Sequence, residues 1–311
     1  MKFGGKTMGK KAFLFPGQGS QYVGMGKELY EKSESAKRIF DEIFSYLDFD
    51  LKTVMFEGPE EKLKETKYTQ PAIVAMSIVL TKLLEEKGIK PDYAAGHSLG
   101  EYSALGATGV LTSADTVKLT ALRGSIMSEV AQKVNGTMAA VLGITSDKIE
   151  EICKTITCGV VEAVNYNEPT QTVIAGEKAA IEEACLKLKE AGAKRALVLP
   201  VSGPFHSSLM KPAGEELKIN FEKFNFKNAE VGFVANTDAK IKTSAVEIKN
   251  ELYAQTFGPV KWVDTINELK VNGVTEFYEV GPGKVLKGLV KKIDKEIDVV
   301  SVEKIEDIEM L

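Results

Sequence analysis

The sequence predicts an α/β protein in which a small domain is inserted into a larger one. Predicted strands and helices alternate along most of the chain, beginning with a short buried strand over residues 11–15 and a helix from about Lys27 to Phe44. Between residues 136 and 201 the order becomes strand, helix, strand, strand, helix, strand, which is the ferredoxin-like order. We therefore predict a large domain made of residues 1–134 and 204–311, with a small domain over 135–203.

Local signals define the elements of the large domain before the insertion. A helix is expected from Thr69 to Lys87, with Pro71 in its first turn and Gly88 as its C-cap. Residues 91–95 resemble a weak strand, and a helix follows Gly100. Another helix begins near Thr112, where Asp115 is positioned to complete a capping box.

The small domain and the end of the chain follow from the same kinds of signal. In the small domain we expect strands at 137–144, 160–165, 171–175 and 195–201, and helices at 146–156 and 177–191. After Pro204 we expect a strand at 231–235, a helix at 260–271, a strand at 275–280 and a basic helix after Gly281-Pro282-Gly283.

Composition excludes several classes of protein. The 311 residues are 44% hydrophobic and 27% charged, which is ordinary for a globular protein and excludes a disordered, collagen-like or disulfide-scaffold chain. The net charge of −4 and the pI near 5.6 give no sign of a nucleic-acid partner. The apolar run after the basic N-terminus is too short for a signal peptide, and no segment has the ~20 apolar residues that span a bilayer. We expect a cytoplasmic protein, a monomer, with no membrane partner.

The counts of cysteine and histidine narrow the chemistry. Cys153, Cys158 and Cys185 form no CxxC pair and are expected to be reduced thiols. Only His97 and His206 are present, so a metal site built on several histidines is excluded and no metal or other cofactor is predicted. Any imidazole that acts as an acid or base must be one of these two.

Residues 96–100, Gly-His-Ser-Leu-Gly, match the GxSxG pattern of a nucleophile elbow. In such a turn the glycines prevent clashes, the serine hydroxyl projects above a sheet, and the N–H that follows it points toward a developing oxyanion. The position between a predicted strand and a predicted helix favours this interpretation over an ordinary glycine turn. Ser98 is therefore the candidate nucleophile.

A serine nucleophile needs a base, and His206 is the better candidate. His97 adjoins Ser98 on a tight turn, where neighbouring side chains point in different directions. His206 lies in the loop after the last strand of the small domain, and such loops commonly carry catalytic side chains. A surface or capping histidine is the alternative. No acidic residue stands in a convincing position to orient His206, so a backbone carbonyl is a possible acceptor.

Two further features are ambiguous from the residues alone. The turn Pro16-Gly17-Gln18-Gly19 fails the GxGxxG dinucleotide pattern because residue 22 is Tyr; it is either a plain turn or a source of a second oxyanion-binding N–H. Arg123 shares a helix face with apolar residues, so it either extends to solvent or an ion pair, or binds a substrate carboxylate.

Three lysines, Lys284, Lys287 and Lys291, share one face of the predicted basic helix. A solvated face is the favoured interpretation. Docking of an acidic partner or of CoA phosphates is the alternative.

Taken together, the segments resemble one family, the malonyl-CoA:acyl-carrier-protein transacylases of type II fatty-acid synthesis, related to the acyltransferase domains of polyketide synthases. The resemblance runs in order from residue 11 almost to the C-terminus, and only residues 1–10 look additional. The matching segments are FPGQGSQ (15–21), YTQPA (68–72), GHSLGEYSAL (96–105), LRG (122–124), NYNEPTQTVIAG (165–176), PVSGPFHSSLMKPA (200–213), NTD with LYAQTFGPVKW (within 236–262) and GPGKVL (281–286).

The resemblance implies a fold and a role for each matching residue. The fold would be a hydrolase-like α/β domain with a parallel-type central sheet and a ferredoxin-like insertion. Ser98 would be acylated, His206 would be its base, and Gln255 would hold His206 through its main-chain carbonyl. The other roles it implies are oxyanion-hole N–H groups from Gln18 and Leu99, pairing of Arg123 with the malonyl carboxylate, and substrate contacts from Phe205, His97 and Asn165.

The expected function is ping-pong transfer of a malonyl group from malonyl-CoA to the phosphopantetheine thiol of holo acyl carrier protein, for fatty-acid biosynthesis. Malonyl-CoA is then a substrate, and no cofactor is involved. The alternatives are a serine esterase or thioesterase that passes the acyl group to water, an acyltransferase of another malonyl-using pathway, and a non-catalytic scaffold that only binds acyl carrier protein.

Overall fold

The computed structural model describes residues 9–311. Most of the segment that looked additional, residues 1–10, therefore lies outside the described residues, although Lys10 already begins the first strand. Within residues 9–311, no helix combines the length and apolar character that a bilayer-spanning segment requires.

A six-stranded sheet, called the central sheet below, has the strand order β10-β9-β1-β2-β7-β8. All neighbours pair in parallel except β8, which is an antiparallel edge strand. The expectation of a parallel-type central sheet is therefore confirmed. The strands are β1 (Lys10–Phe15), β2 (Tyr93–Gly96), β7 (Gly232–Val234), β8 (Ile241–Lys242), β9 (Val274–Val280) and β10 (Val299–Val302).

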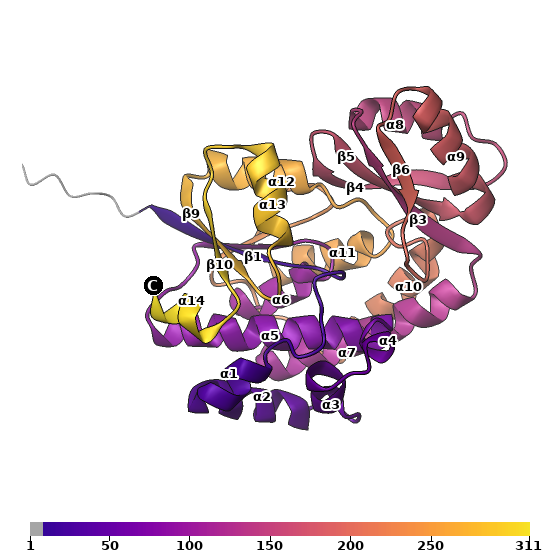
Figure 1. Cartoon of the computed structure of the whole chain (residues 1–311). Helices are drawn as coiled ribbons and strands as arrows, with labels where there is room; N and C mark the ends of the chain where they lie inside the picture. Colours follow the sequence, from indigo (N-terminus) through magenta and orange to yellow (C-terminus); the bar gives the residue numbers. More distant parts are fainter. Residues whose placement is uncertain (1–8) are drawn as a thin grey trace, which may run out of the picture.

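Helices cover both faces of this sheet (Figure 1). Successive side chains of β1 accordingly point into two different cores, one on each face. Phe13 and Phe15 pack into the larger core with most of the helices, whereas Ala12 and Leu14 pack with α12 and α13. The helices on the larger-core side are α1 (Lys27–Lys32), α2 (Glu34–Ser45), α3 (Leu51–Phe56), α4 (Glu60–Leu63), α5 (Thr66–Glu86), α6 (Gly100–Ala107), α7 (Ser113–Gln132), α10 (Lys211–Phe221), α11 (Ala245–Gln255) and α14 (Ile305–Glu309). On the other side lie α12 (Trp262–Val271) and α13 (Val285–Ile293).

A second, four-stranded sheet lies beside the central sheet and its helices, with antiparallel strands in the order β4-β5-β3-β6 (Figure 1). Two helices cover one of its faces, and the other face contributes Met138, Val164 and Val173 to the large core. The elements of this four-stranded unit are β3 (Gly136–Leu142), α8 (Ser146–Cys153), β4 (Val161–Glu168), β5 (Gln171–Glu177), α9 (Lys178–Glu190) and β6 (Arg195–Val198).

Several predicted boundaries were wrong, each for a local reason. The helix expected over 27–44 is two helices, because the Ser33 side chain accepts the Ala36 N–H and starts a new one. The helix expected from Thr69 begins at Thr66, so Pro71 lies in its second turn rather than its first. Strand β6 ends at Val198, before the expected 201, and β4 continues to Glu168 through residues expected in a turn.

Other local predictions are confirmed, one of them in part. Gly88 has φ 79° just after α5, as a C-cap glycine should. The Thr112 hydroxyl accepts the Asp115 N–H at 3.1 Å and so caps α7, but among the described residues the Asp115 side chain forms no return bond to Thr112 that would complete a capping box. Seven further elements have no counterpart among those expected from the sequence: α3, α4, α10, α11, α14, β8 and β10.

Candidate active site

The candidate nucleophile stands on a sharp turn between β2 and α6. Ser98 has φ 52°, in the left-handed region that non-glycine residues rarely adopt. Close contacts explain both glycines of the pattern: a Cβ on Gly96 would lie 1.8 Å from the carbonyl carbon of Gly100, and a Cβ on Gly100 would lie 2.1 Å from the carbonyl oxygen of Phe15. The turn therefore has the strained geometry of a nucleophile elbow.

The base expected from the sequence contacts this serine. The Oγ of Ser98 lies 2.6 Å from Nε2 of His206, and Nδ1 of His206 lies 2.9 Å from the main-chain oxygen of Gln255. Because a carbonyl oxygen only accepts, Nδ1 carries the ring proton and Nε2 has a lone pair facing the serine hydroxyl. Residues that are far apart in sequence thus form a nucleophile, a base and an orienting acceptor.

The surroundings of His206 keep its imidazole neutral. The side chain is buried, and burial lowers its pKa from 6.5 to about 3; the cationic Arg123 nearby acts in the same direction. A neutral imidazole at pH 7 is the form that accepts a proton.

Two residues that line the cavity of Ser98, Gln18 and Leu99, have backbone N–H groups without an acceptor within residues 9–311. Leu99 directly precedes α6, and Gln18 follows β1 in the Gly17-Gln18-Gly19 turn. The side-chain amide of Gln18 donates to the hydroxyl of Thr66 at 3.2 Å, which fixes the turn to α5.

Arg123 is buried with 1% exposure, so the interpretation that it extends to solvent was wrong. Its Nη1 and Nη2 donate to the side-chain oxygens of Gln70 at 2.9 Å and Gln255 at 3.1 Å, and its guanidinium lies 4.8 Å from the centre of the Tyr102 ring. No carboxylate of residues 9–311 forms an ion pair with it, so the structural ion pair was wrong too.

The charge of Arg123 is therefore balanced only partly by the protein. Its Nε has no hydrogen-bond partner among the described residues. Burial lowers the pKa of this guanidinium, while Tyr102 and Glu101 oppose that effect, and arginine remains cationic. A buried cation with an unused donor, beside the nucleophile, is suited to receive an anionic group.

A cavity of about 130 Å³ joins these groups. Phe205 and Asn165 line it together with Ser98, Arg123 and His206. The side-chain oxygen of Asn165 is buried and has no partner among the described residues, so it is available to a ligand.

His97 lies at the same cavity but faces away from the serine. Its Nε2 lies 2.7 Å from the side-chain oxygen of Asn167 on β4, and its ring contacts Trp262 edge to face. The prediction that His97 does not deprotonate Ser98 agrees with this geometry. His97 instead links the elbow to the four-stranded unit.

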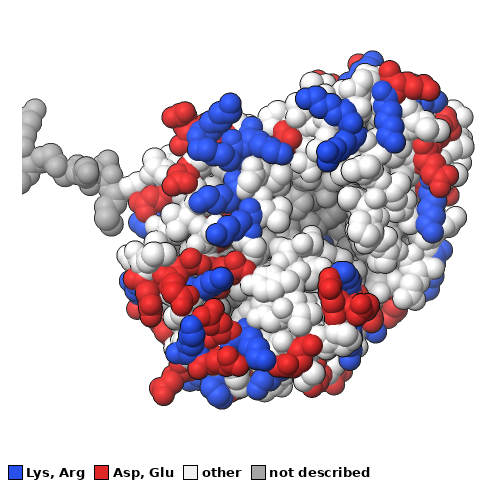
Figure 2. Space-filling view, in the orientation of Figure 1, with Lys and Arg blue, Asp and Glu red and all other residues white. Residues whose placement is uncertain are grey.

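A groove of about 360 Å³ adjoins the cavity. It shares Gln18, His97, Asn165 and Leu199 with the cavity, and α13 contributes Val285, Leu286 and Leu289 to its wall. Figure 2 shows the surface hollowed between the part built on the central sheet and the four-stranded unit, with lysine and arginine side chains on both sides. Four lysines line a further depression between β3 and α13; they are Lys194, Lys291, Lys292 and Lys295.

A solvated helix face was expected for Lys284, Lys287 and Lys291, and the structure agrees with this in part. Lys284 and Lys291 are exposed, and Lys287 makes only a long contact of 3.9 Å with Asp298. Lys284 precedes α13 rather than lying within it.

The cysteines and the possible metal ligands of residues 9–311 form no disulfide and no metal-binding cluster. Cys153 and Cys185 are buried and Cys158 is exposed, each as a free thiol. Residues 9–311 contain no group of three or more His, Cys, Asp or Glu side chains that could hold a metal ion.

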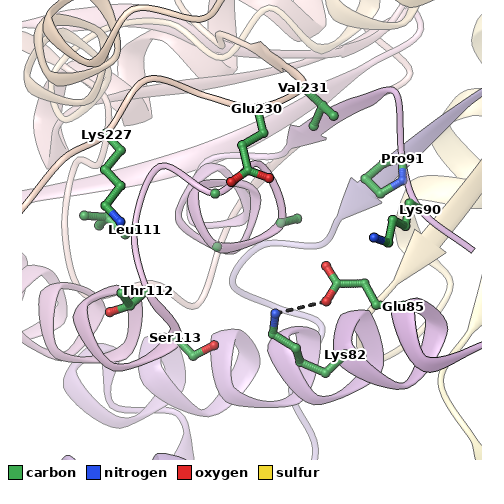
Figure 3. A pocket seen from close by; sticks show the side chains of 13 residues that line it. Lys82, Glu85, Lys90, Pro91, Leu111, Thr112, Ser113, Lys227, Glu230 and Val231 are labelled. Atoms are coloured by element: carbon green, nitrogen blue, oxygen red, sulfur yellow. Dashed lines mark hydrogen bonds and ion pairs between the residues drawn. The ribbon is translucent and has the colours of Figure 1, made fainter. Parts of the chain in front are cut away.

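Another cavity, of about 390 Å³, lies away from this site, near the N-terminus of α7 (Figure 3). Its walls mix both charges, and Lys82 and Glu85 pair across 3.0 Å. It contains none of the groups around Ser98, so the chemistry belongs to the smaller cavity.

The sequence did not reveal two residues that hold the elbow. Asn236, directly after β7, accepts the Ser98 N–H at 2.8 Å, and its own N–H bonds to Glu101 on α6. Burial raises the pKa of the Glu101 carboxyl well above its ordinary value, with a further contribution from Glu251. The only signal was that both residues belong to segments of the family-like pattern, Asn236 to NTD and Glu101 to GHSLGEYSAL.

Comparison with known proteins agrees with this geometry. The acyl transferase domain family matches residues 12–307. The malonyl CoA-acyl carrier protein transacylase of Bacillus subtilis (strain 168) is 46% identical over 305 residues, covering 97% of this chain and 96% of that protein. The Staphylococcus aureus (strain MRSA252) protein of the same name is 42% identical, covering 97% and 98%.

Solved structures show the same fold. An acyl carrier protein S-malonyltransferase from Vibrio cholerae superposes with a TM-score of 0.93 at 40% identity, covering 97% of this chain and 99% of that one. A malonyl-transacylase solved in complex with a type II polyketide-synthase acyl-carrier protein has the same TM-score and identity, covering 97% and 98%. This chain therefore belongs to the acyl transferase domain family and, within it, to the malonyl CoA-acyl carrier protein transacylases.

Proposed function

We propose that this chain transfers the malonyl group of malonyl-CoA to the phosphopantetheine thiol of acyl carrier protein through a malonyl-serine intermediate. The observation that carries the proposal is the 2.6 Å contact between Ser98 Oγ and His206 Nε2 next to the buried Arg123. A serine–histidine pair supplies the acyl transfer, and the cation supplies the preference for an acyl group that ends in a carboxylate.

In the first half-reaction, His206 Nε2 takes the hydroxyl proton while Ser98 Oγ attacks the thioester carbonyl. The N–H groups of Gln18 and Leu99 stabilise the negative oxygen of the tetrahedral intermediate. Its collapse breaks the C–S bond, and the leaving CoA sulfur receives the proton from His206. The main-chain oxygen of Gln255 stabilises the imidazolium, in the place where many serine enzymes use a carboxylate.

In the second half-reaction the carrier thiol takes the place of CoA. Its proton passes to His206, its sulfur attacks the malonyl ester, and Ser98 leaves with the proton returned from the imidazole. Both halves use the same groups in opposite order. Arg123 holds the malonyl carboxylate throughout, and Phe205, His97 and Asn165 complete the walls around the acyl group.

The groove beside the cavity suits an extended thiol arm, which CoA and the carrier share. It leads from Gln18 along α13, whose Lys291 and Lys292 then face the lysine-lined depression. We propose that these lysines meet the phosphates of CoA and the acidic surface of the carrier protein. The charge on the rims of the hollow in Figure 2 supports this direction of approach.

The four-stranded unit is proposed to be a separate ferredoxin-like small domain over residues 135–203, inserted between residues 1–134 and 204–311. Its strand order and its two covering helices support this division. The insertion contributes one wall of the cavity, including Asn165 and Met138.

The test of the function is a direct search for the intermediate. After mixing with malonyl-CoA and acid quench, mass spectrometry should find one malonyl group on the peptide containing Ser98. Ser98→Ala should abolish the adduct, and the surface control Ser35→Ala should retain it. An intact protein that carries no adduct would refute the proposal.

Transfer must also be separated from hydrolysis. With holo acyl carrier protein present, the malonyl group should appear on the carrier. Release chiefly as free malonate would instead favour the thioesterase alternative. A scaffold without catalysis would give neither product.

We propose fatty-acid biosynthesis as the pathway; another malonyl-using pathway is the alternative, since one solved relative is bound to a polyketide-synthase carrier. A monomer in the cytoplasm, using no cofactor, stays a prediction from the sequence.

A further inference from the structure

We propose that Asn236 is a positioning residue for the nucleophile: its side-chain amide bonds to both sides of the elbow and holds Ser98 in the conformation that reacts. This inference rests on the proposed function, since it assigns a residue to the same acyl transfer. It concerns a contact between β7 and the turn after β2, which are neighbours in the sheet.

The amide of Asn236 is buried and fully used. Its side-chain oxygen accepts the N–H of Ser98 at 2.8 Å, and its side-chain nitrogen donates to the carbonyl oxygen of Gly96 at 2.7 Å. One planar group therefore binds the backbone on either side of His97. Without the amide the Ser98 N–H would have no acceptor among residues 9–311, and the Gly96 carbonyl oxygen would lose the one bond it forms outside the strand pairing.

The position of Asn236 is itself fixed from two directions. Its N–H donates to the carboxyl of Glu101, which lies one turn into α6 from Ser98, and its carbonyl oxygen accepts the N–H of Lys261 at 2.9 Å. The next residue, Thr237, is held by Glu251 through both its N–H, at 2.9 Å, and its hydroxyl. Asn236 is thus bonded both to Ser98 and to Glu101 of α6, the helix that follows Ser98, and this set of bonds is called the Asn236 network below.

The Asn236 network holds the backbone at a strained residue, Ser98. Ser98 has φ 52°, a conformation that a serine keeps only when its surroundings enforce it. A relaxed turn would move Oγ away from His206, which it now meets at 2.6 Å, and would turn the adjacent Leu99 N–H as well. A displacement of about 1 Å in such a group can reduce a rate by about 100-fold.

The experiment is single-turnover malonylation of Ser98, followed across malonyl-CoA concentrations. Asn236→Ala should reduce the maximal acylation rate by about 100-fold and leave the half-saturating concentration within about twofold, because Arg123 and the groove are untouched. The matched control is Asn220→Ala: Asn220 is also a buried asparagine with two side-chain hydrogen bonds, but it lies on α10 outside the cavity. Its acylation rate should stay within about twofold of the original.

Asn236→Asp tests the two contacts separately and is nearly the same size. It keeps an acceptor for the Ser98 N–H and loses the donor to Gly96, so a fall of about 10-fold is expected. If Asn236→Ala does not fold, as judged by its thermal melt, Asn236→Asp decides the question.

A folded Asn236→Ala that acylates within about threefold of the original would overturn the inference. A loss seen only in the half-saturating concentration would also overturn it, since the effect would then lie in binding. Failure of the proposed function looks different, because the unaltered chain would then form no adduct at Ser98.

Discussion

Replacing Arg123 with alanine should separate malonyl transfer from acetyl transfer. Two of the five guanidinium N–H groups bond to Gln70 and Gln255, which leaves three, including Nε, for the substrate. Two charge-assisted bonds to a carboxylate in this buried place are worth about 3–5 kcal/mol together. Arg123→Ala should therefore lower kcat/KM for malonyl-CoA by about 150- to 5,000-fold.

Acetyl-CoA has no carboxylate, so its transfer should change by less than about 10-fold, a loss that reflects only the two glutamines left without their donor. The assay compares kcat/KM for both donors with holo acyl carrier protein as acceptor. Arg38→Ala, which removes an exposed arginine 3.5 Å from Glu86, is the matched control and should alter neither activity. Equal losses for the two donors would refute the assignment of Arg123 as the carboxylate clamp.

Two further predictions concern the base and the elbow. Since burial lowers the pKa of His206 to about 3, its neutral form persists as pH falls, and single-turnover acylation should change by less than about twofold between pH 7 and pH 5.5; a decline centred near pH 6.5 would contradict this. The same shift makes the folded state less stable as pH falls from 6.5 toward 3, because the unfolded chain binds a proton there that the folded chain does not, and this should appear in urea titrations across that range. Gly100→Ala places a methyl group 2.1 Å from the Phe15 carbonyl oxygen and should lower the free energy of unfolding by about 2–3 kcal/mol, whereas Gly288→Ala, in open space on α13, should not lower it; equal urea midpoints for the two variants would argue against the clash.

The parts of the site that the sequence could predict depend either on contacts within a short segment or on a residue type that occurs only once or twice in the chain. The GxSxG turn is local, because its glycines are required by contacts within a few residues and with the adjacent strand β1. His206 could be chosen because the chain contains only two histidines and His97 adjoins the nucleophile. The main-chain acceptor from Gln255 came only from the family resemblance, since every residue has a carbonyl and none is marked in the sequence.

The parts that could not be predicted depend on contacts between distant segments. Asn236 lies 138 residues from Ser98, and nothing in its neighbourhood indicates which backbone group its amide binds. The burial of Arg123 without an ion pair was equally hidden, because helix periodicity gives a face and not the partner that covers it. Helix boundaries failed at Ser33, whose side chain caps a new helix, and at Thr66, where α5 begins in close contact with Gly124 of α7. Such contacts outweigh average propensity.

The place of β1 in the central sheet has a consequence for biosynthesis of the chain. This N-terminal strand pairs with β2 on one side and with β9 on the other, where Ala12 lies opposite Phe277. During translation, β1 therefore leaves the ribosome long before β9 has been synthesised. One edge of β1 then stays unpaired until translation is nearly complete. The four-stranded unit, whose strands are all close in sequence, needs no such wait. Truncated products that lack the last fifth of the polypeptide would accordingly contain every strand of the four-stranded unit but would lack β9 and β10 of the central sheet.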